Sequence, residues 1–318
     1  MPCRPATGRL RGLPSPGARS RRWRTPSDPR SSLFLVMAPM TAPVVELGSR
    51  RYDIATRALV MGVLNRTPDS FFDKGATWEW DAFWARADQV VEEGADVLDV
   101  GAVKAGPGPE VTEAEELDRL IPAVQGLVAR FDVPVSADTW RASVAAEAFA
   151  AGAVVGNDIS GFADPQYLEA AAAAGASVVA THIRLAPRVP DPEPVYVDLV
   201  GEVCAYLAER AGRALAAGIP VQRVMVDAGL DLGKTAAQSV ELLRASPALA
   251  ALGYPVLLSA SNKRFLGDLL GLEINERRNA TAAAHALGVA LGCRVLRAHD
   301  VRGTCRVRDM LAAIMEAQ

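Results

Sequence analysis

The sequence lacks the features that mark several common classes of protein. It has only four cysteines, and no two of them have CxxC spacing or cluster with the three histidines. No apolar run is long enough to cross a membrane. A net charge of −3 argues against nucleic acid or an anionic membrane as the main partner. We therefore expect free thiols and a cytoplasmic location.

The first forty residues have almost no acidic side chains and no long apolar segment. Eight arginines accompany a single acid, Asp28, among many Pro, Gly and Ser residues. Such a segment cannot bury enough apolar surface to fold alone, so we expect residues 1–45 to form a disordered extension. An arginine-rich, acid-poor composition also suits a targeting peptide. A third possibility is a start assigned too early, since Met37 and Met40 lie just before the folded pattern.

From residue 58 onward, apolar runs alternate with amphipathic segments. The runs are rich in Val, Leu and Ala and hardly alternate in polarity, which is typical of parallel strands covered on both faces. The expected strands are residues 58–64, 95–100, 133–137, 154–156, 176–181, 223–226, 254–260 and 293–298. The expected helices include residues 80–93, 113–130, 141–151, 196–217, 236–245 and 276–291. Glycines at the helix-to-strand joints suit left-handed C-terminal caps: Gly94, Gly152, Gly175, Gly218 and Gly292.

Eight strands alternating with helices predict an α/β fold, a single (β/α)8 TIM barrel over residues 50–318. The alternative is an open doubly wound sheet, but no GxGxxG segment follows any expected strand. The GKT at residues 233–235 does not form a nucleotide-binding P-loop, because Ala228 stands where the motif needs its first glycine.

A polar residue stands at or just after every expected strand. These positions are Asn65, Asp99, Asp138, Asn157 with Asp158, His182, Asp227, residues 261–263 and residues 297–300. Taken singly, Asp138 and Asp227 could cap helices, Lys263 could be a solvated helix-start residue, and His182 could be a satisfied barrel histidine. Because a barrel brings its strand ends together, the whole set favours a ligand site there.

Several ordered motifs resemble those of the dihydropteroate synthase family, over residues 57 to 316. VLNRTPDSF resembles its N-x-T-P-D-S-F loop, and VDAGLDLGK resembles D-P-G-x-G-F-G-K. SASNKRFLG resembles G-x-S-R-K-S-F, and LRAHDV resembles R-V-H-D-V. The resemblance implies a TIM barrel, commonly a homodimer, that joins 6-hydroxymethyl-dihydropterin pyrophosphate to p-aminobenzoate and releases pyrophosphate.

The resemblance also implies roles for particular residues. The pterin positions are Asp138, Asn157, Asp227 and Lys263. The pyrophosphate positions are Arg297 and His299, and the Mg²⁺ position is Asn65. A carboxylate such as Asp227 can accept two N–H bonds from the amidine edge of a pterin. Magnesium prefers oxygen ligands that it shares with phosphates, so a single amide oxygen is a plausible contribution from the protein.

The chain departs from the family pattern after the second expected strand. Where the family has G-G-E-S-T-R-P-G, this chain has GAVKAGPG, with Ala105 at the threonine position and Gly106 at the arginine position. Loss of a charged hydrogen bond to a phosphate costs about 1.5–3 kcal/mol. Lys104 could supply a replacement charge, but an ammonium lacks the fork of a guanidinium.

Other departures fall around the pterin position. Asp231 and Ser259 replace glycines, Leu232 replaces a phenylalanine, Asn262 replaces an arginine and Ile183 replaces a methionine. Glycine lets a flat ring approach the backbone, so the larger groups should crowd the slot or demand another ligand.

We therefore expect a synthase homologue with a degenerate site for pterin pyrophosphate and p-aminobenzoate, and with no or very weak activity. It resembles the divergent second copy that actinobacteria often carry. Three alternatives stay open: an active synthase that uses Lys104, a transferase for another pterin-like or phosphorylated substrate, and a binding protein or regulator without chemistry.

Overall fold

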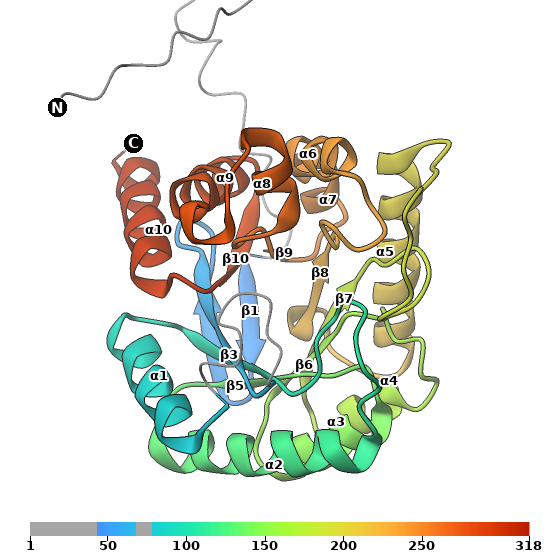
Figure 1. Ribbon diagram of the computed structural model, residues 1–318, viewed down its shortest axis with the longest axis vertical. Coiled ribbons are helices and arrows are strands. Elements are labelled where there is room, and N and C mark those ends of the chain that lie inside the picture. The colour runs from blue at the N-terminus through green and yellow to red at the C-terminus, as the bar shows by residue number, and fades with distance from the viewer. Residues whose placement is uncertain (1–42, 68–77, 318) are drawn as a thin grey trace, which may run out of the picture. The chain divides into compact units, whose positions relative to one another are not determined.

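The computed structural model describes residues 43–67 and 78–317, and these include a closed barrel of parallel strands (Figure 1). Around the barrel the strands run in the order β10-β3-β4-β5-β6-β7-β8-β9, so that the last strand pairs with β3 and β9. Their bounds are β3 (Leu59–Asn65), β4 (Val97–Gly101), β5 (Val135–Asp138), β6 (Val155–Asp158), β7 (Ser177–Thr181), β8 (Val224–Asp227), β9 (Val256–Leu258) and β10 (Cys293–Ala298). The predicted TIM barrel is confirmed, and the strand ends differ from the predicted ones by no more than two residues.

Helices surround the barrel (Figure 1). They are α1 (Trp80–Glu92), α2 (Glu113–Arg130), α3 (Ala142–Ala150), α4 (Tyr167–Ala173), α5 (Leu199–Ala216), α6 (Ala236–Arg244), α7 (Ser246–Ala250), α8 (Arg264–Leu270), α9 (Arg278–Ala290) and α10 (Val301–Glu316), with short 3-10 turns at Val221–Arg223 and Ile274–Glu276. The predicted helices are all present, whereas α4, α7, α8 and α10 were not among the predicted ranges. The five glycines predicted as caps all have positive φ, between +62° and +107°.

A hairpin precedes the barrel and closes its amino-terminal end. Its strands β1 (Val44–Leu47) and β2 (Arg50–Asp53) pair antiparallel. Val45 and Leu47 are buried in one cluster with inward residues from the first half of several barrel strands, such as Leu59 and Met61. The sequence did not reveal this hairpin, and β1 includes residues 44 and 45 of the expected disordered extension. Residues 1–42 of that extension lie outside the described residues.

A second, larger apolar cluster fills the space between the barrel and its helices. Val60 and Leu64 of β3 belong to it, so both faces of this strand are buried, as its unbroken apolar run predicted. Gly62 lies between them, and a Cβ atom there would come within 2.4 Å of Val90 on α1. Glycine therefore lets α1 pack directly on the strand.

The composition led us to expect no membrane-spanning segment and free thiols, and the described part of the chain bears on both. None of its helices combines the length and the apolar character that a membrane crossing needs. Cys204, Cys293 and Cys305 form no disulfide.

Candidate functional site

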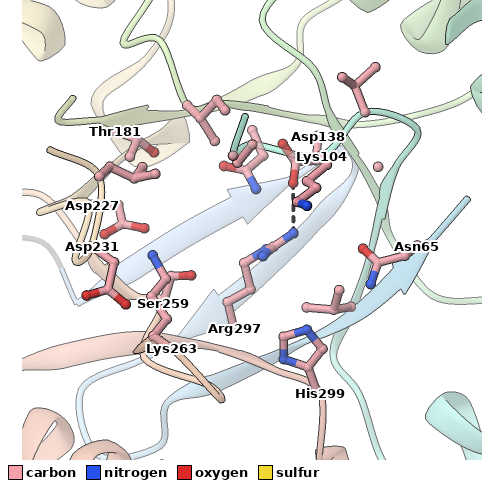
Figure 2. A pocket seen from close by; sticks show the side chains of 18 of the residues that line it. Asn65, Lys104, Asp138, Thr181, Asp227, Asp231, Ser259, Lys263, Arg297 and His299 are labelled. Atoms are coloured by element: carbon pink, nitrogen blue, oxygen red, sulfur yellow. Dashed lines mark hydrogen bonds and ion pairs between the residues drawn. The ribbon is translucent and has the colours of Figure 1, made fainter. Parts of the chain in front are cut away.

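A cavity of about 320 Å³ opens at the carboxyl ends of the barrel strands (Figure 2). All seven residues that the sequence assigned to a ligand site line it: Asn65, Asp138, Asn157, Asp227, Lys263, Arg297 and His299. They come from six different strands or the loops that follow them. The structure thus brings the set together, while the individual roles of its members remain predictions.

Arg297 of β10 joins two acidic residues from other strands. Its Nε donates to Asp99 of β4 at 2.6 Å. Its Nη2 donates to Asp138 of β5 at 2.8 Å (Figure 2). Asp99 is fully buried and also accepts from the Ser136 hydroxyl at 2.6 Å and from the Asn157 amide at 3.3 Å. The guanidinium is therefore held in one orientation.

The electrostatics of this triad follow from its burial. Burial raises the pKa of Asp138, Arg297 opposes that shift, and Asp99 adds to it. Burial works against the charge of Arg297, but its pKa is raised because the two carboxylates outweigh that effect. Arg297 thus stays charged, and its charge is offset by neighbours in the protein. In this structure its guanidinium already forms ion pairs with Asp99 and Asp138.

His299, in contrast to Arg297, contributes no positive charge at neutral pH. Its Nδ1 lies 3.0 Å from the hydroxyl oxygen of Ser261, which also accepts from the His299 backbone N–H at 3.0 Å. Burial, followed by the charge of Arg297, lowers the pKa of His299 to about 3. A neutral imidazole can donate or accept a hydrogen bond but gives an anion little electrostatic attraction.

The opposite side of the cavity holds Asp227 and Lys263. One carboxylate oxygen of Asp227 accepts from the Gly229 N–H at 2.8 Å, and the Lys263 ammonium donates to the Leu230 carbonyl. Burial raises the pKa of Asp227 and lowers that of Lys263, and each group opposes the shift of the other. This is a buried acid and base pair with hydrogen-bonding capacity toward the cavity, as recognition of a polar heterocycle requires.

The simpler explanations fit some of these residues and not others. Asp138 does not cap α3, whose N-cap residue is Arg141. Lys263 does precede α8, but its side chain is half-buried and its ammonium turns back to donate to the Leu230 carbonyl. His182 is a satisfied barrel histidine outside the cavity lining. Its Nδ1 lies 2.8 Å from the Lys234 ammonium, and burial followed by that charge lowers its pKa to about 3.

The substituted positions alter the cavity wall. Asp231 lines the cavity with a left-handed backbone, φ +65°, where a glycine would be unstrained. Its carboxylate accepts from the Phe265 N–H at the start of α8, at 3.2 Å, and lies 3.3 Å from the Ser239 hydroxyl. Ser259 and Leu232 also line the cavity. A carboxylate and a hydroxymethyl group thus stand where the family motifs have glycines, and a leucine stands where they have a phenylalanine.

Several lining residues were not singled out by the sequence. Examples are Val63, Ile159, Thr181 and Arg264. Thr181 is the last residue of β7, so the strand-end rule could have found it. Arg264 directly follows Lys263 at the start of α8, a helix that the sequence did not reveal. Asp99 was noted as a strand-end acid, but its contact with Arg297 joins residues 198 positions apart.

A barrel with a cavity at the carboxyl ends of its strands, lined by charged side chains from several of them, defines a ligand-binding or catalytic TIM-barrel protein. The family described as pterin binding enzyme matches residues 61–299, and the chain belongs to that family. It is 44% identical to the inactive dihydropteroate synthase 2 of Mycobacterium leprae, over 82% of this chain and 91% of that protein.

Solved structures of the same family agree with this assignment. The Yersinia pestis dihydropteroate synthase in its sulfonamide drug complex superposes with a TM-score of 0.83 at 34% identity, over 86% of this chain and all of that one. The Xanthomonas albilineans synthase in complex with 7,8-dihydropteroate gives a TM-score of 0.75 at 37% identity, over 86% of this chain and 99% of that one.

Proposed function

We propose that this chain is a dihydropteroate synthase homologue that binds a pterin-like ligand and has little or no synthase activity. The observation that carries the proposal is the uneven character of the cavity. Its heterocycle side keeps Asp227 and Lys263, whereas the wall after β4 presents Ala105 and Gly106, with no hydroxyl or guanidinium. The similarity to the inactive synthase 2 of Mycobacterium leprae supports the same conclusion.

In this proposal the pterin lies against the buried polar groups on the inner wall of the cavity. Its amidine edge donates to Asp227, while Lys263 reaches a ring nitrogen or carbonyl. Asn157 and Asp138 contact the remaining ring edge. The Xanthomonas albilineans relative, solved with 7,8-dihydropteroate, supports a ligand of this class.

The proposed cofactor is Mg²⁺, with Asn65 as its protein ligand. The described residues contain no cluster of three or more His, Cys, Asp or Glu side chains suited to a metal. The nearby carboxylates of Asp99 and Asp138 are occupied by Arg297. Asn65 fits magnesium only if phosphate and water oxygens complete the coordination shell. When bound, the ion would neutralise the charge of a departing diphosphate.

A catalytic reading has one specific observation in its favour. Lys104 lines the cavity in the loop after β4. It stands two positions before Gly106, which occupies the family's arginine position. An ammonium at this wall could stabilise a departing diphosphate, although without bidentate geometry. We keep an active synthase, or a transferase for another phosphorylated substrate, as the second candidate.

A pyrophosphate-release assay distinguishes the two candidates. The substrates are 6-hydroxymethyl-dihydropterin pyrophosphate and p-aminobenzoate with Mg²⁺, and the control is the Yersinia pestis synthase. Loss of one charged phosphate contact predicts turnover lower than the control by at least one to two decades, roughly. Turnover within about tenfold of the control, a barrier difference near 1.4 kcal/mol, would contradict inactivity.

We also propose a cytoplasmic homodimer. The described cysteines are unpaired, which suits a reducing compartment. Met310 and Ile314 of α10 are 62% and 52% exposed, and Leu287 of the adjacent helix α9 is 43% exposed (Figure 1). Light scattering on the purified chain measures the mass directly, and a monomer at micromolar concentration would contradict this assembly.

A further inference from the structure

The wall after β4 is held by a residue from a distant loop. Arg188, which follows β7, donates its backbone N–H to the Ala105 carbonyl at 3.1 Å. Its guanidinium donates to the Lys104 carbonyl at 3.4 Å and to the Pro109 carbonyl. One residue therefore binds three carbonyls of the loop that replaces the family's threonine and arginine. Lys104 and Ala105 line the cavity, so this contact fixes part of the cavity wall.

The conformation of Arg188 indicates that its side chain matters. Its φ is +67°, in the left-handed region that residues other than glycine rarely adopt. A glycine would make the same turn and keep the backbone bond to Ala105, but it would lose the two guanidinium bonds. Within residues 43–67 and 78–317, Arg188 makes no ion pair, so its guanidinium serves the carbonyls of this loop.

The contact holds the backbone from which the side chain of Lys104 extends. That side chain points into the cavity on the side of Asp138 and Arg297 (Figure 2). Among the residues that the structure describes, no carboxylate or carbonyl pairs with its ammonium. Arg297 is offset by two acids and His299 is neutral, so among the described residues that line this end of the cavity Lys104 supplies a positive charge that no acid offsets.

We propose that Arg188 is a positioning residue that orients Lys104 toward the phosphoryl group of the ligand. The inference rests on the proposed function and adds how this chain would hold the phosphoryl end of such a ligand without the family's threonine and arginine. A compact ammonium binds a phosphate as a point charge and needs no fork, but its flexible stem needs a fixed starting point. Arg188 fixes that point by holding the carbonyls of Lys104 and Ala105.

Calorimetry with matched ligands tests the assignment. The probes are 6-hydroxymethyl-dihydropterin pyrophosphate, the same pterin without phosphates, and inorganic pyrophosphate. Lys104→Ala should weaken binding of the pterin pyrophosphate roughly tenfold or more and change binding of the unphosphorylated pterin less than about twofold. Lys104→Arg should keep most of the affinity. Loss of affinity for inorganic pyrophosphate as well would show that the diphosphate alone is recognised.

Arg188→Gly is the variant that separates positioning from folding. Glycine accepts the left-handed backbone, so the melting temperature should stay close to that of the unmodified chain. Amide exchange at residues 102–111 should rise, and affinity for the pterin pyrophosphate alone should fall. Because both changes act through one ammonium, Arg188→Gly combined with Lys104→Ala should bind no more weakly than Lys104→Ala alone.

The outcomes separate this inference from the function on which it rests. Equal affinity of the unmodified chain for the two pterins would overturn the role of Lys104 and leave a pterin-binding protein. Additive losses in the double variant, or equal losses for both pterins, would overturn the positioning role of Arg188. Binding of neither pterin would overturn both this inference and the proposed function.

Discussion

Replacing Arg297 with methionine tests the triad at the cavity wall. The guanidinium is paired at 2.6 Å with Asp99, whose side chain is fully buried, and at 2.8 Å with Asp138, whose side chain is 16% exposed. Methionine fills much of the volume but leaves two adjacent carboxylates without a counter-charge. Breaking a buried ion pair costs about 3–5 kcal/mol. Arg297→Met should therefore lower the free energy of unfolding by that amount at neutral pH, measured by urea denaturation.

The pH dependence of this loss identifies its cause. Burial already raises the pKa of Asp138 in the folded state, and removing Arg297 removes the charge that opposes this shift, so that pKa rises further above its unfolded value. The folded variant then takes up protons first as the pH falls, so the loss should be smaller at mildly acidic pH than at neutral pH. Adding Asp138→Asn to Arg297→Met should recover part of the stability by removing one of the two charges.

A surface pair provides the matched control. Arg130 binds Asp88 through two nitrogens, but the two side chains are 48% and 38% exposed. Arg130→Met should cost only about 0–1 kcal/mol, because solvent screens exposed pairs. A loss below about 1 kcal/mol for Arg297→Met, or a loss independent of pH, would refute the assigned role of the triad.

Two further substitutions test other features. Asp231→Gly should tighten binding of pterin pyrophosphate in calorimetry, because it removes a carboxylate from the cavity wall and glycine tolerates φ +65°. Asp231→Asn keeps the size of the side chain and removes its charge, so it separates the effect of charge from that of crowding. Equal affinity in all three proteins would contradict this explanation. His285 is fully buried, and burial lowers its pKa from 6.5 to about 4. The unfolded chain therefore protonates first as the pH falls, so the unmodified protein should lose stability relative to His285→Gln by about 1.4 kcal/mol per pH unit between these two values. Urea denaturation across that range measures the difference, and a gap that does not change with pH would contradict the shift.

The barrel could be predicted because the sequence signals for its strands and helices lie within short stretches of the chain. Each strand is a short apolar run buried on both faces, and each of several helices ends in a left-handed glycine. The strand-end rule then indicated residues that line one cavity, since a closed barrel brings all its strand ends to one rim. These steps use neighbouring residues and the topology of the fold.

The parts that could not be predicted depend on contacts between distant segments. Arg297 could face an anionic ligand or pair with acids of the protein, and only the structure shows Asp99 and Asp138 within reach. The contact of Arg188 with the loop after β4 likewise spans more than 80 residues. The hairpin β1–β2 was missed because its strands have only four residues each, and its burial depends on the end of the barrel that it covers.

The triad has a consequence for the evolutionary history of such proteins. Arg297 stands on the final barrel strand, and its two acidic partners stand on the second and third, so the three residues tie together the region where the ring closes. Loss of any of them is expected to cost stability, whether or not a reaction is still performed. A lineage that has lost catalysis would therefore still keep these three residues. Their presence in a sequence does not show that the protein is an active enzyme.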